Sequence, residues 1–180
     1  MLVYPHAQKG MVLLVSLIFL LLLSLIGIAA MTRATQQEKM AAGIQHANHS
    51  FQAAEAALRQ GESWLRVNWP GLLACTSPFM CVPPASARIQ RMPGFDPISG
   101  VRWLPVAGGL YGIQSLGPSM TPADYPANTS TWLYRITGIG LHGQSRTVLE
   151  SLYARYQDAS GGTEGVSPPS VRRVMWRQIQ

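Results

Sequence analysis

The chain is 180 residues long, carries 14 Lys and Arg against 8 Asp and Glu, and has a formal net charge of +6. This length suits one modest domain. Only 12% of the residues are charged, and the arginines are scattered without a flanking aromatic cluster, so the composition does not support a nucleic-acid-binding groove and we do not expect nucleic acid as a partner.

An apolar stretch runs from Met11 to Met31 without a charged residue. As a helix it would be about 31 Å long, close to the hydrocarbon thickness of a bilayer. A secretory signal peptide has a shorter apolar core and a small-residue cleavage site after it, whereas this stretch continues into helix-compatible residues. We therefore predict a membrane span. Lys9 and Arg33 flank it on opposite sides, so the positive-inside rule hardly discriminates between the two orientations.

A second helical pattern follows the span. Glu55 and Glu62 each precede an arginine by four residues, as in helical ion pairs, and Pro70 and Gly71 end the pattern. Small or apolar residues form a seam on one helix face at alternating spacings of four and three. The members of this seam are Met40, Ile44, Ala47, Phe51, Ala54, Leu58, Gly61 and Leu65.

No proline interrupts residues 11–67, so we predict one continuous helix. Its first part would lie in lipid or another apolar setting, and its second part would pack on the chain's own sheet. The alternative is a membrane helix followed by a separate coiled-coil stalk. Gly27 and Gly43 each weaken a helix by up to about 1 kcal/mol relative to alanine, so we expect bending or melting to occur there first.

Cys75 and Cys81 stand in the sequence "CTSPFMC". Two thiols without CxxC spacing or a nearby histidine cannot complete a four-ligand zinc site. In an oxidising compartment they predict a short loop closed by a disulfide, and Pro78 helps the chain to turn back. Two unpaired thiols are the alternative.

The distal half of the chain predicts loops and an antiparallel sheet. Proline, glycine and serine are dense from residue 69 to residue 130. The strand candidates are 101–106, 110–116, 131–140 and 145–156, with "GIGLHG" (138–143) reversing the chain between the last two. By alternation, Trp132, Tyr134 and Ile136 share a face, which we expect the helix seam to cover. Residues 157–170 are typical of a flexible linker, and "VRRVMWRQIQ" could be a last strand, a partner-binding segment or a frayed end.

The sequence contains no recognisable catalytic motif. It has no GxSxG elbow, Walker loop or GxGxxG, and no acid pair stands out among its 8 carboxylates. His46 and His49 could share a helix face, but without a third ligand nearby we interpret them as surface residues. We therefore expect no enzyme activity, no catalytic residue, no metal, no cofactor and no small-molecule substrate.

Several segments resemble the PilX-type minor pilins of bacterial type IV pili. The resemblance rests on "QKG" (8–10), the apolar helix and "EKMAAGIQHANHSFQAAEAALRQGE" (38–62), and "YRITGIG" and "VLESLYARY" are similar to the C-terminal strands of that group. Residues 65–130 show no such likeness. The resemblance implies an α+β fold shaped like the lollipop of pilins, in which a long N-terminal helix packs on an antiparallel β-sheet.

The resemblance also implies processing at the N-terminus. Prepilin peptidase would recognise Lys9, cut between Gly10 and Met11, and the new amine of Met11 would be methylated. The expected parts of the chain are a cleaved leader (1–10), an apolar membrane or filament-core helix (11–32), an amphipathic helix (33–67), a loop-rich head with the sheet (68–156), and a linker with a basic C-terminal tail (157–180).

The implied function is to prime or promote the assembly of type IV pili, and hence to support attachment and twitching motility. The expected location is the inner membrane, crossed once with the C-terminal domain in the periplasm, and then the extracellular filament. The implied partners are other minor and major pilins, prepilin peptidase, the inner-membrane assembly platform and membrane lipid. Lipid and a bundle of apolar helices solvate Leu and Ile almost equally well, so exchange between the two is feasible.

One position departs from the family pattern. Most pilins have a glutamate fifth after the cleavage point, where it can pair with the N-terminal amine of a neighbouring subunit, and this chain has Val15 there. Burying an unpaired ammonium is costly, so we place the subunit at or near the filament tip. The alternatives are a minor pseudopilin of a type II secretion system, a DNA-uptake pilin that uses Arg172, Arg173 and Arg177, and a membrane anchor with an uncleaved N-terminus.

Overall fold

The computed structural model describes residues 9–121, 130–156 and 171–179. The chain divides into two compact units, one ending at Ile44 and one beginning at Gln45, and each is described by itself. A single helix, α1 (Lys9–Asn68), contributes to both units. The continuous helix expected over 11–67 is confirmed, and it runs unbroken through Gly27 and Gly43, where the sequence suggested weak points.

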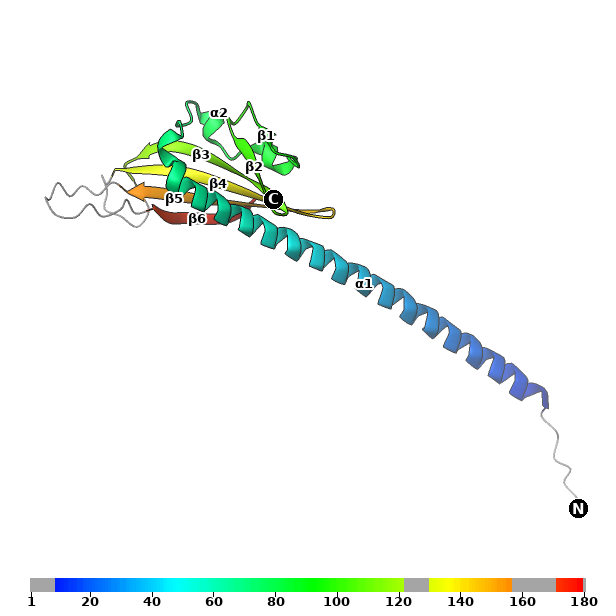
Figure 1. Ribbon diagram of the computed structural model, residues 1–180. Helices are drawn as coiled ribbons and strands as arrows, with labels where there is room; N and C mark the ends of the chain where they lie inside the picture. The colour runs from blue at the N-terminus through cyan, green and yellow to red at the C-terminus, as the bar shows by residue number, and fades with distance from the viewer. Residues whose placement is uncertain (1–8, 122–129, 157–170, 180) are drawn as a thin grey trace, which may run out of the picture. The chain divides into compact units, whose positions relative to one another are not determined.

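The second unit contains the end of α1 and a six-stranded antiparallel sheet in the order β1-β2-β3-β4-β5-β6 (Figure 1). This arrangement confirms the predicted α+β fold with an antiparallel sheet. Its remaining elements in chain order are η1 (Trp69–Gly71), α2 (Pro78–Cys81), η2 (Ala85–Arg88), β1 (Gly94–Phe95), β2 (Arg102–Val106), β3 (Gly109–Ser119), β4 (Thr131–His142), β5 (Ser145–Tyr156) and β6 (Val171–Ile179).

The hairpin between β4 and β5 is tighter than the sequence suggested. His142 pairs with Ser145, so only two residues form the turn, and the first of them, Gly143, has a φ of +56° that suits glycine. The expectation that residues 138–143 reverse the chain is therefore wrong for its first half. Gly138 and Gly140 lie within β4 and pair with β5.

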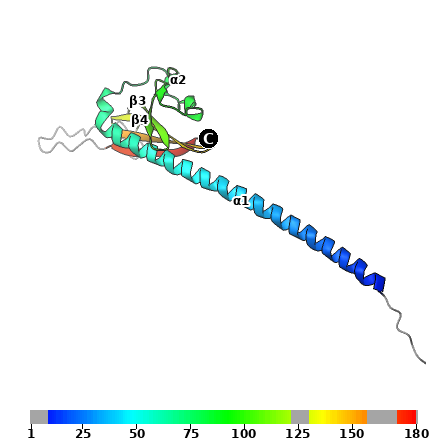
Figure 2. The ribbon, with the colours of Figure 1, turned by 45° about the vertical axis from the view of Figure 1, so that its right-hand side comes forward.

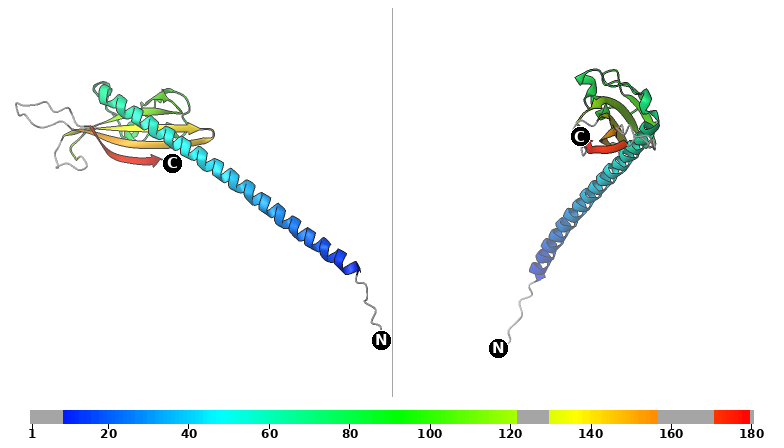
Figure 3. Two further views of the ribbon diagram at one scale, coloured as in Figure 1. Left: turned by 60° about the horizontal axis from the view of Figure 1, so that its bottom comes forward. Right: turned by 90° about the vertical axis from the view of Figure 1, so that its left-hand side faces the viewer.

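Helix α1 covers one face of the sheet and lies across β4 and β5 in Figure 3. Its seam forms a core with the sheet, as predicted, and Tyr134 and Ile136 of β4 are buried in it while Trp132 packs at its margin. The fully or almost fully buried members of this core are Ala54, Leu58, Leu65, Tyr134, Ile136, Leu149 and Tyr153.

The first part of the predicted seam does not pack on the sheet. Met40 is 65% exposed and Ile44 is 63% exposed, and Ala47 is also exposed. Burial begins at Ser50, whose hydroxyl lies 2.8 Å from that of Thr147 on β5. The seam is therefore longer than the sheet that covers it, because β4 ends at His142.

The opposite face of the sheet carries a second core that the sequence did not reveal. Ile139 and Ile136 point to opposite faces of β4 because side chains alternate along a strand. Ile139 packs with residues from β2, β3, β5 and the segment before β2, namely Ala87, Val101, Trp103, Leu110 and Val148. The segment from α2 to β2 thus covers this face, and Figure 2 shows α2 near β3, away from the β6 edge.

The C-terminal segment forms β6, a strand of nine residues that pairs with β5 and forms the edge of the sheet. Of the three alternatives left open by the sequence, the last strand is the one that the structure contains. The strands expected at 101–106 and 110–116 correspond to β2 and to most of β3. The linker expected at 157–170 lies outside the described residues.

Candidate functional site

The first unit presents an apolar helix with no partner among the described residues. Every described side chain from Met11 to Ile44 is exposed. Within the described chain, α1 is the one helix that is long and apolar enough to cross a membrane. An apolar surface of this size is not stable in water, so it needs an apolar environment outside the chain.

The few polar side chains in the apolar stretch are satisfied inside the helix itself. The hydroxyl of Ser16 donates to the carbonyl of Leu13, and that of Ser24 donates to the carbonyl of Leu21, both at 2.9 Å. These groups therefore require neither water nor a polar partner. The helix can accordingly be surrounded by hydrocarbon or by other apolar helices without leaving a polar group unpaired.

The sequence-predicted processing residues lie at the beginning of α1. The helix starts at Lys9 and continues through Gly10, although the side chains of these two residues lie outside the described ones. Met11 is 65% exposed and Val15 is 59% exposed. These four residues all lie in α1. The sequence from Met11 to Met31 contains no acidic residue.

Cys75 and Cys81 are joined by a disulfide with their Cα atoms 5.4 Å apart. The loop that they close is anchored to the sheet at both cysteines. The Cys75 amide donates to the Ser115 carbonyl on β3 at 2.9 Å, and the Arg135 guanidinium on β4 donates to the Cys81 carbonyl. Ser77 accepts a hydrogen bond from the Met80 amide and so caps α2.

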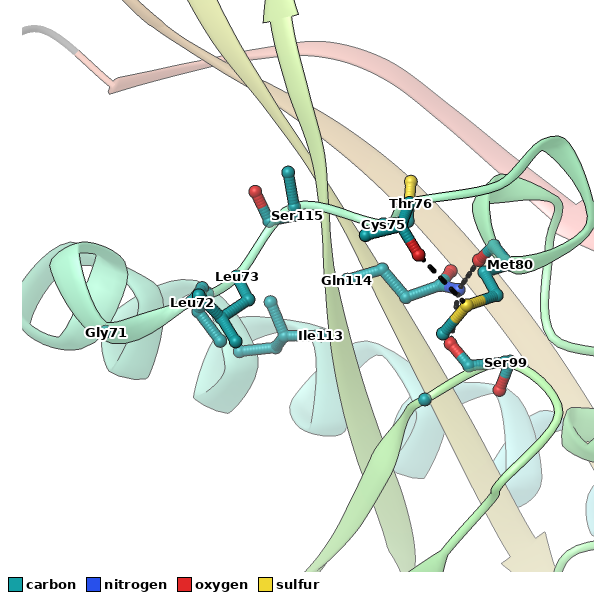
Figure 4. A pocket seen from close by; sticks show the side chains of 12 residues that line it. Gly71, Leu72, Leu73, Cys75, Thr76, Met80, Ser99, Ile113, Gln114 and Ser115 are labelled. Carbon is teal, nitrogen blue, oxygen red and sulfur yellow. Dashed lines mark hydrogen bonds between the residues drawn. The ribbon is translucent and has the colours of Figure 1, made fainter.

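A cleft of about 380 Å³ lies between η1, the disulfide loop and β3 (Figure 4). Gln114 points from β3 toward the loop and donates to the Met80 carbonyl at 2.8 Å. The Ser115 hydroxyl is buried without a hydrogen-bond partner among the described residues. The described lining contains no histidine and no carboxylate, so the cleft offers hydrogen-bonding groups but no acid or base for catalysis.

A buried ion pair, which sequence reasoning missed, ties the sheet to the disulfide loop. Glu150 on β5 is 0% exposed and its Oε1 lies 3.4 Å from Nε of Arg135 and 3.1 Å from Nη2 of Arg177. Burial lowers the pKa of Arg135, and the attraction of Glu150 opposes this effect. The role of this group is structural, because Arg135 also holds Gln114 and the Cys81 carbonyl.

Two of the three arginines of the C-terminal strand are engaged inside the chain. Arg173 forms an ion pair with Glu62 at 2.8 Å and donates to the Tyr153 hydroxyl at 2.9 Å, and Arg177 is paired with Glu150. Burial and the hydrogen bond with Glu62 raise the pKa of Tyr153 to about 12. Glu62 therefore pairs with β6 across the core rather than with the arginine four residues along its own helix.

The structure places a third histidine beside the two on α1. The ring centroid of His142, at the end of β4, lies 5.1 Å from that of His46 and 4.6 Å from that of His49. In the part of the chain that the structure describes, no group of three ligating side chains is arranged to hold a metal ion. The contact joins the β4–β5 hairpin to the helix just before burial begins.

Part of α1 is similar to a known protein family. Residues 9–59 match the family model described as PilX N-terminal. No curated protein and no solved structure shows significant similarity to the chain. The matched range contains the whole exposed apolar helix and the part of α1 that begins to pack on the sheet.

This match confirms the resemblance at the N-terminal part of the chain. PilX-type proteins are structural pilins of the type IV pilus and are not known as enzymes. A pilin interacts with other pilus components, and its apolar N-terminal helix is compatible with a membrane-anchored pilus subunit. Residues 9–59 are therefore similar to the N-terminal domain of the PilX-type pilins of the type IV pilus.

Proposed function

We propose that this protein is a minor pilin that primes or promotes the assembly of a type IV pilus at or near the filament tip. The observation that carries the proposal is the exposed, uncharged helix from Met11 to Met31 within a segment that matches the PilX N-terminal family. In this role the protein supports attachment and twitching motility without catalysing a reaction.

The helix suits two environments in succession. Before assembly it anchors the protein in the inner membrane, with the unit from Gln45 onward in the periplasm. After assembly it packs among the helices of other pilins. Because Ser16 and Ser24 satisfy their hydroxyls within the helix, transfer from lipid to a helix bundle leaves no polar side chain of the span unpaired.

Cleavage between Gly10 and Met11 fits this role, because it leaves the apolar helix as the new N-terminus. The leader up to Gly10 would be removed by prepilin peptidase after recognition of Lys9, and the new amine of Met11 would be methylated. The helix stays attached to the sheet, since α1 continues without a break to Asn68.

Val15 supports the tip position. A carboxylate at this place would neutralise the N-terminal amine of the next subunit, and the exposed apolar helix offers none between Met11 and Met31. A buried ammonium without a partner costs several kcal/mol. At the tip there is no further subunit whose amine must be neutralised, so the valine is tolerated.

The decisive experiment is intact-mass and N-terminal analysis of the protein recovered from sheared surface filaments. The proposal predicts a chain that begins with N-methylated Met11 and includes Gln180. A recovered chain that retains Lys9, or one that begins well past Met31, would contradict it. Recovery only from the membrane, with no material in filaments, would instead favour a simple membrane anchor.

Two further experiments separate the alternatives. Deletion should remove surface pili and twitching, whereas loss of enzyme secretion with normal pili would identify a type II pseudopilin. Immunogold labelling should place the protein at filament ends, and even labelling along the shaft would refute the tip position. DNA uptake has less support, because Arg173 and Arg177 are already paired with Glu62 and Glu150.

A further inference from the structure

The segment from Arg88 to Arg102 contains β1, which lies at the edge of the sheet (Figure 1). This segment exposes several large apolar side chains. Four such side chains are at least 65% exposed, namely Ile89 (77%), Met92 (75%), Phe95 (65%) and Ile98 (79%). Single exposed apolar residues are ordinary, but four in one short segment indicate an interaction surface. We call residues 88–102 the β1 surface.

The β1 surface is held in a defined conformation by Asp96. This carboxylate accepts hydrogen bonds from the Ser86 hydroxyl at 2.6 Å, from the Ser99 hydroxyl and from the Ile98 amide at 3.0 Å. The side chain of Trp103, directly after the segment, is 1% exposed and anchors it in the second core. The exposed apolar groups are therefore presented by a fixed turn, which lowers the entropic cost of binding.

A second contact fixes the other end of the β1 surface. The Arg146 guanidinium on β5 donates to the carbonyl of Ala87 at 3.1 Å and to that of Ile89 at 3.2 Å. The Gln90 side chain donates to the Met92 carbonyl at 2.7 Å. The backbone on both sides of Ile89 and Met92 is thus tied down, while their side chains remain in solvent.

The exposed charges of the β1 surface are all positive. Arg88, Arg91 and Arg102 are exposed, and among the described residues none of the three forms an ion pair. The one carboxylate of the segment, Asp96, is 9% exposed and already engaged. Phe95 pairs directly with Arg102 across β1 and β2, so an apolar and a positive side chain lie side by side.

We propose that the β1 surface is a docking site for an acidic patch on another protein. The alternation of Arg with Met, Phe and Ile is the composition of protein interfaces, where a dry apolar centre is rimmed by charge. An anionic membrane is less suitable, because binding to it typically uses clusters of four to eight basic residues and this segment has three. A second copy of this basic chain would be repelled.

The test is photocrosslinking in the cells that make the protein. The full chain carries p-benzoylphenylalanine at position 95, and the adducts are identified and mapped by mass spectrometry. The proposal predicts one protein adduct whose crosslinked site lies beside Asp or Glu side chains. The charge reversals R91E and R102E together should reduce the adduct at least tenfold, and reversing the mapped acid to lysine should restore it.

The matched control is Arg66→Glu, another exposed arginine of the same unit, which should leave the adduct unchanged. Each variant should give the same near-ultraviolet circular dichroism spectrum as the wild type, because Arg66, Arg91 and Arg102 are all exposed. Adducts with lipid alone, with a second copy of the chain, or with an uncharged protein surface would each overturn the proposal, as would the absence of any adduct. None of these outcomes bears on the apolar helix, so they are distinguishable from a failure of the pilin assignment.

Discussion

The close approach of α1 to β4 depends on glycine, and Gly138→Ala tests this dependence. A Cβ added at Gly138 would lie 2.6 Å from the Ala54 carbonyl oxygen and 3.0 Å from the Leu58 amide nitrogen. Both atoms belong to the backbone of a helix, so no rotamer change can relieve the contact. At Gly140 an added Cβ would overlap the backbone of Ser50 more severely still.

The expected loss of folding stability follows from the distance that the helix must move. Carbon and oxygen atoms pack comfortably at about 3.5 Å, so α1 would retreat by about 1 Å. Forced overpacking of a core costs about 1–3 kcal/mol, and contact with rigid backbone argues for the upper part of that range. Alanine recovers about 0.5–1 kcal/mol by restricting the unfolded chain, which leaves a net loss of about 2 kcal/mol.

The measurement is thermal unfolding of the full chain in mild detergent, followed by near-ultraviolet circular dichroism of the tryptophans. A loss of about 2 kcal/mol lowers Tm by roughly 6 °C for a unit of this size. Gly71→Ala is the control, because nothing lies within 4 Å of its added Cβ. If Gly138→Ala unfolds at the same temperature as Gly71→Ala and the wild type, the helix does not lie on β4 as described.

Three other perturbations test the second unit in the same assay. Glu150→Gln leaves the buried Arg135 without its counter-charge and should cost about 3–5 kcal/mol, whereas Glu55→Gln, in an exposed pair, should cost less than about 1 kcal/mol; equal losses would show that the buried pair is not formed. Burial raises the pKa of Asp96, but the hydrogen bonds that it accepts outweigh this effect and lower the pKa. The contribution of Asp96 to folding stability is therefore present above the ordinary carboxyl pKa of about 3.9 and is lost as the pH falls through the lower pKa of the folded state. Asp96→Asn should therefore flatten the loss of stability below pH 4, and an unchanged acid profile would contradict this. Cys75→Ser opens a loop with a sequence separation of 6 and should cost about 2 kcal/mol, and full stability under reducing conditions would refute the role of the disulfide.

The helix and the main strands could be predicted because each depends on local pattern. An unbroken run without proline sets the length of α1, and alternation of β-forming residues sets β4 and β5. Gly138 and Gly140 belong both to the strand candidate 131–140 and to the predicted reversal 138–143, and this ambiguity has a physical reason. Glycine is favoured both where a chain reverses and where another backbone approaches closely, and only the packing of Ser50 on Gly140 separates the two causes.

The polar interior of the sheet could not be predicted from sequence. Glu150 and Arg135 lie in consecutive strands that also contain other polar and charged residues, so the sequence pattern does not single them out as a pair. Their pairing follows from strand register, which places Arg135 opposite Leu152 and thus diagonal to Glu150. The same holds for His142, which joins His46 and His49 only because the β4–β5 hairpin ends beside the helix.

The pattern of apolar residues along α1 predicts which sides of the helix need apolar neighbours, but it does not identify those neighbours. From Met11 to Met31 the helix is apolar on all sides, which requires an apolar medium on all sides. From Met40 onward the apolar residues occupy one stripe, which requires a partner on one side only. The sheet supplies that partner from Ser50, yet Met40 and Ile44 carry the same stripe and remain exposed. The stripe alone therefore could not show where the chain's own sheet ends, because a side chain covered by β4 and one left exposed before it follow the same spacing rule.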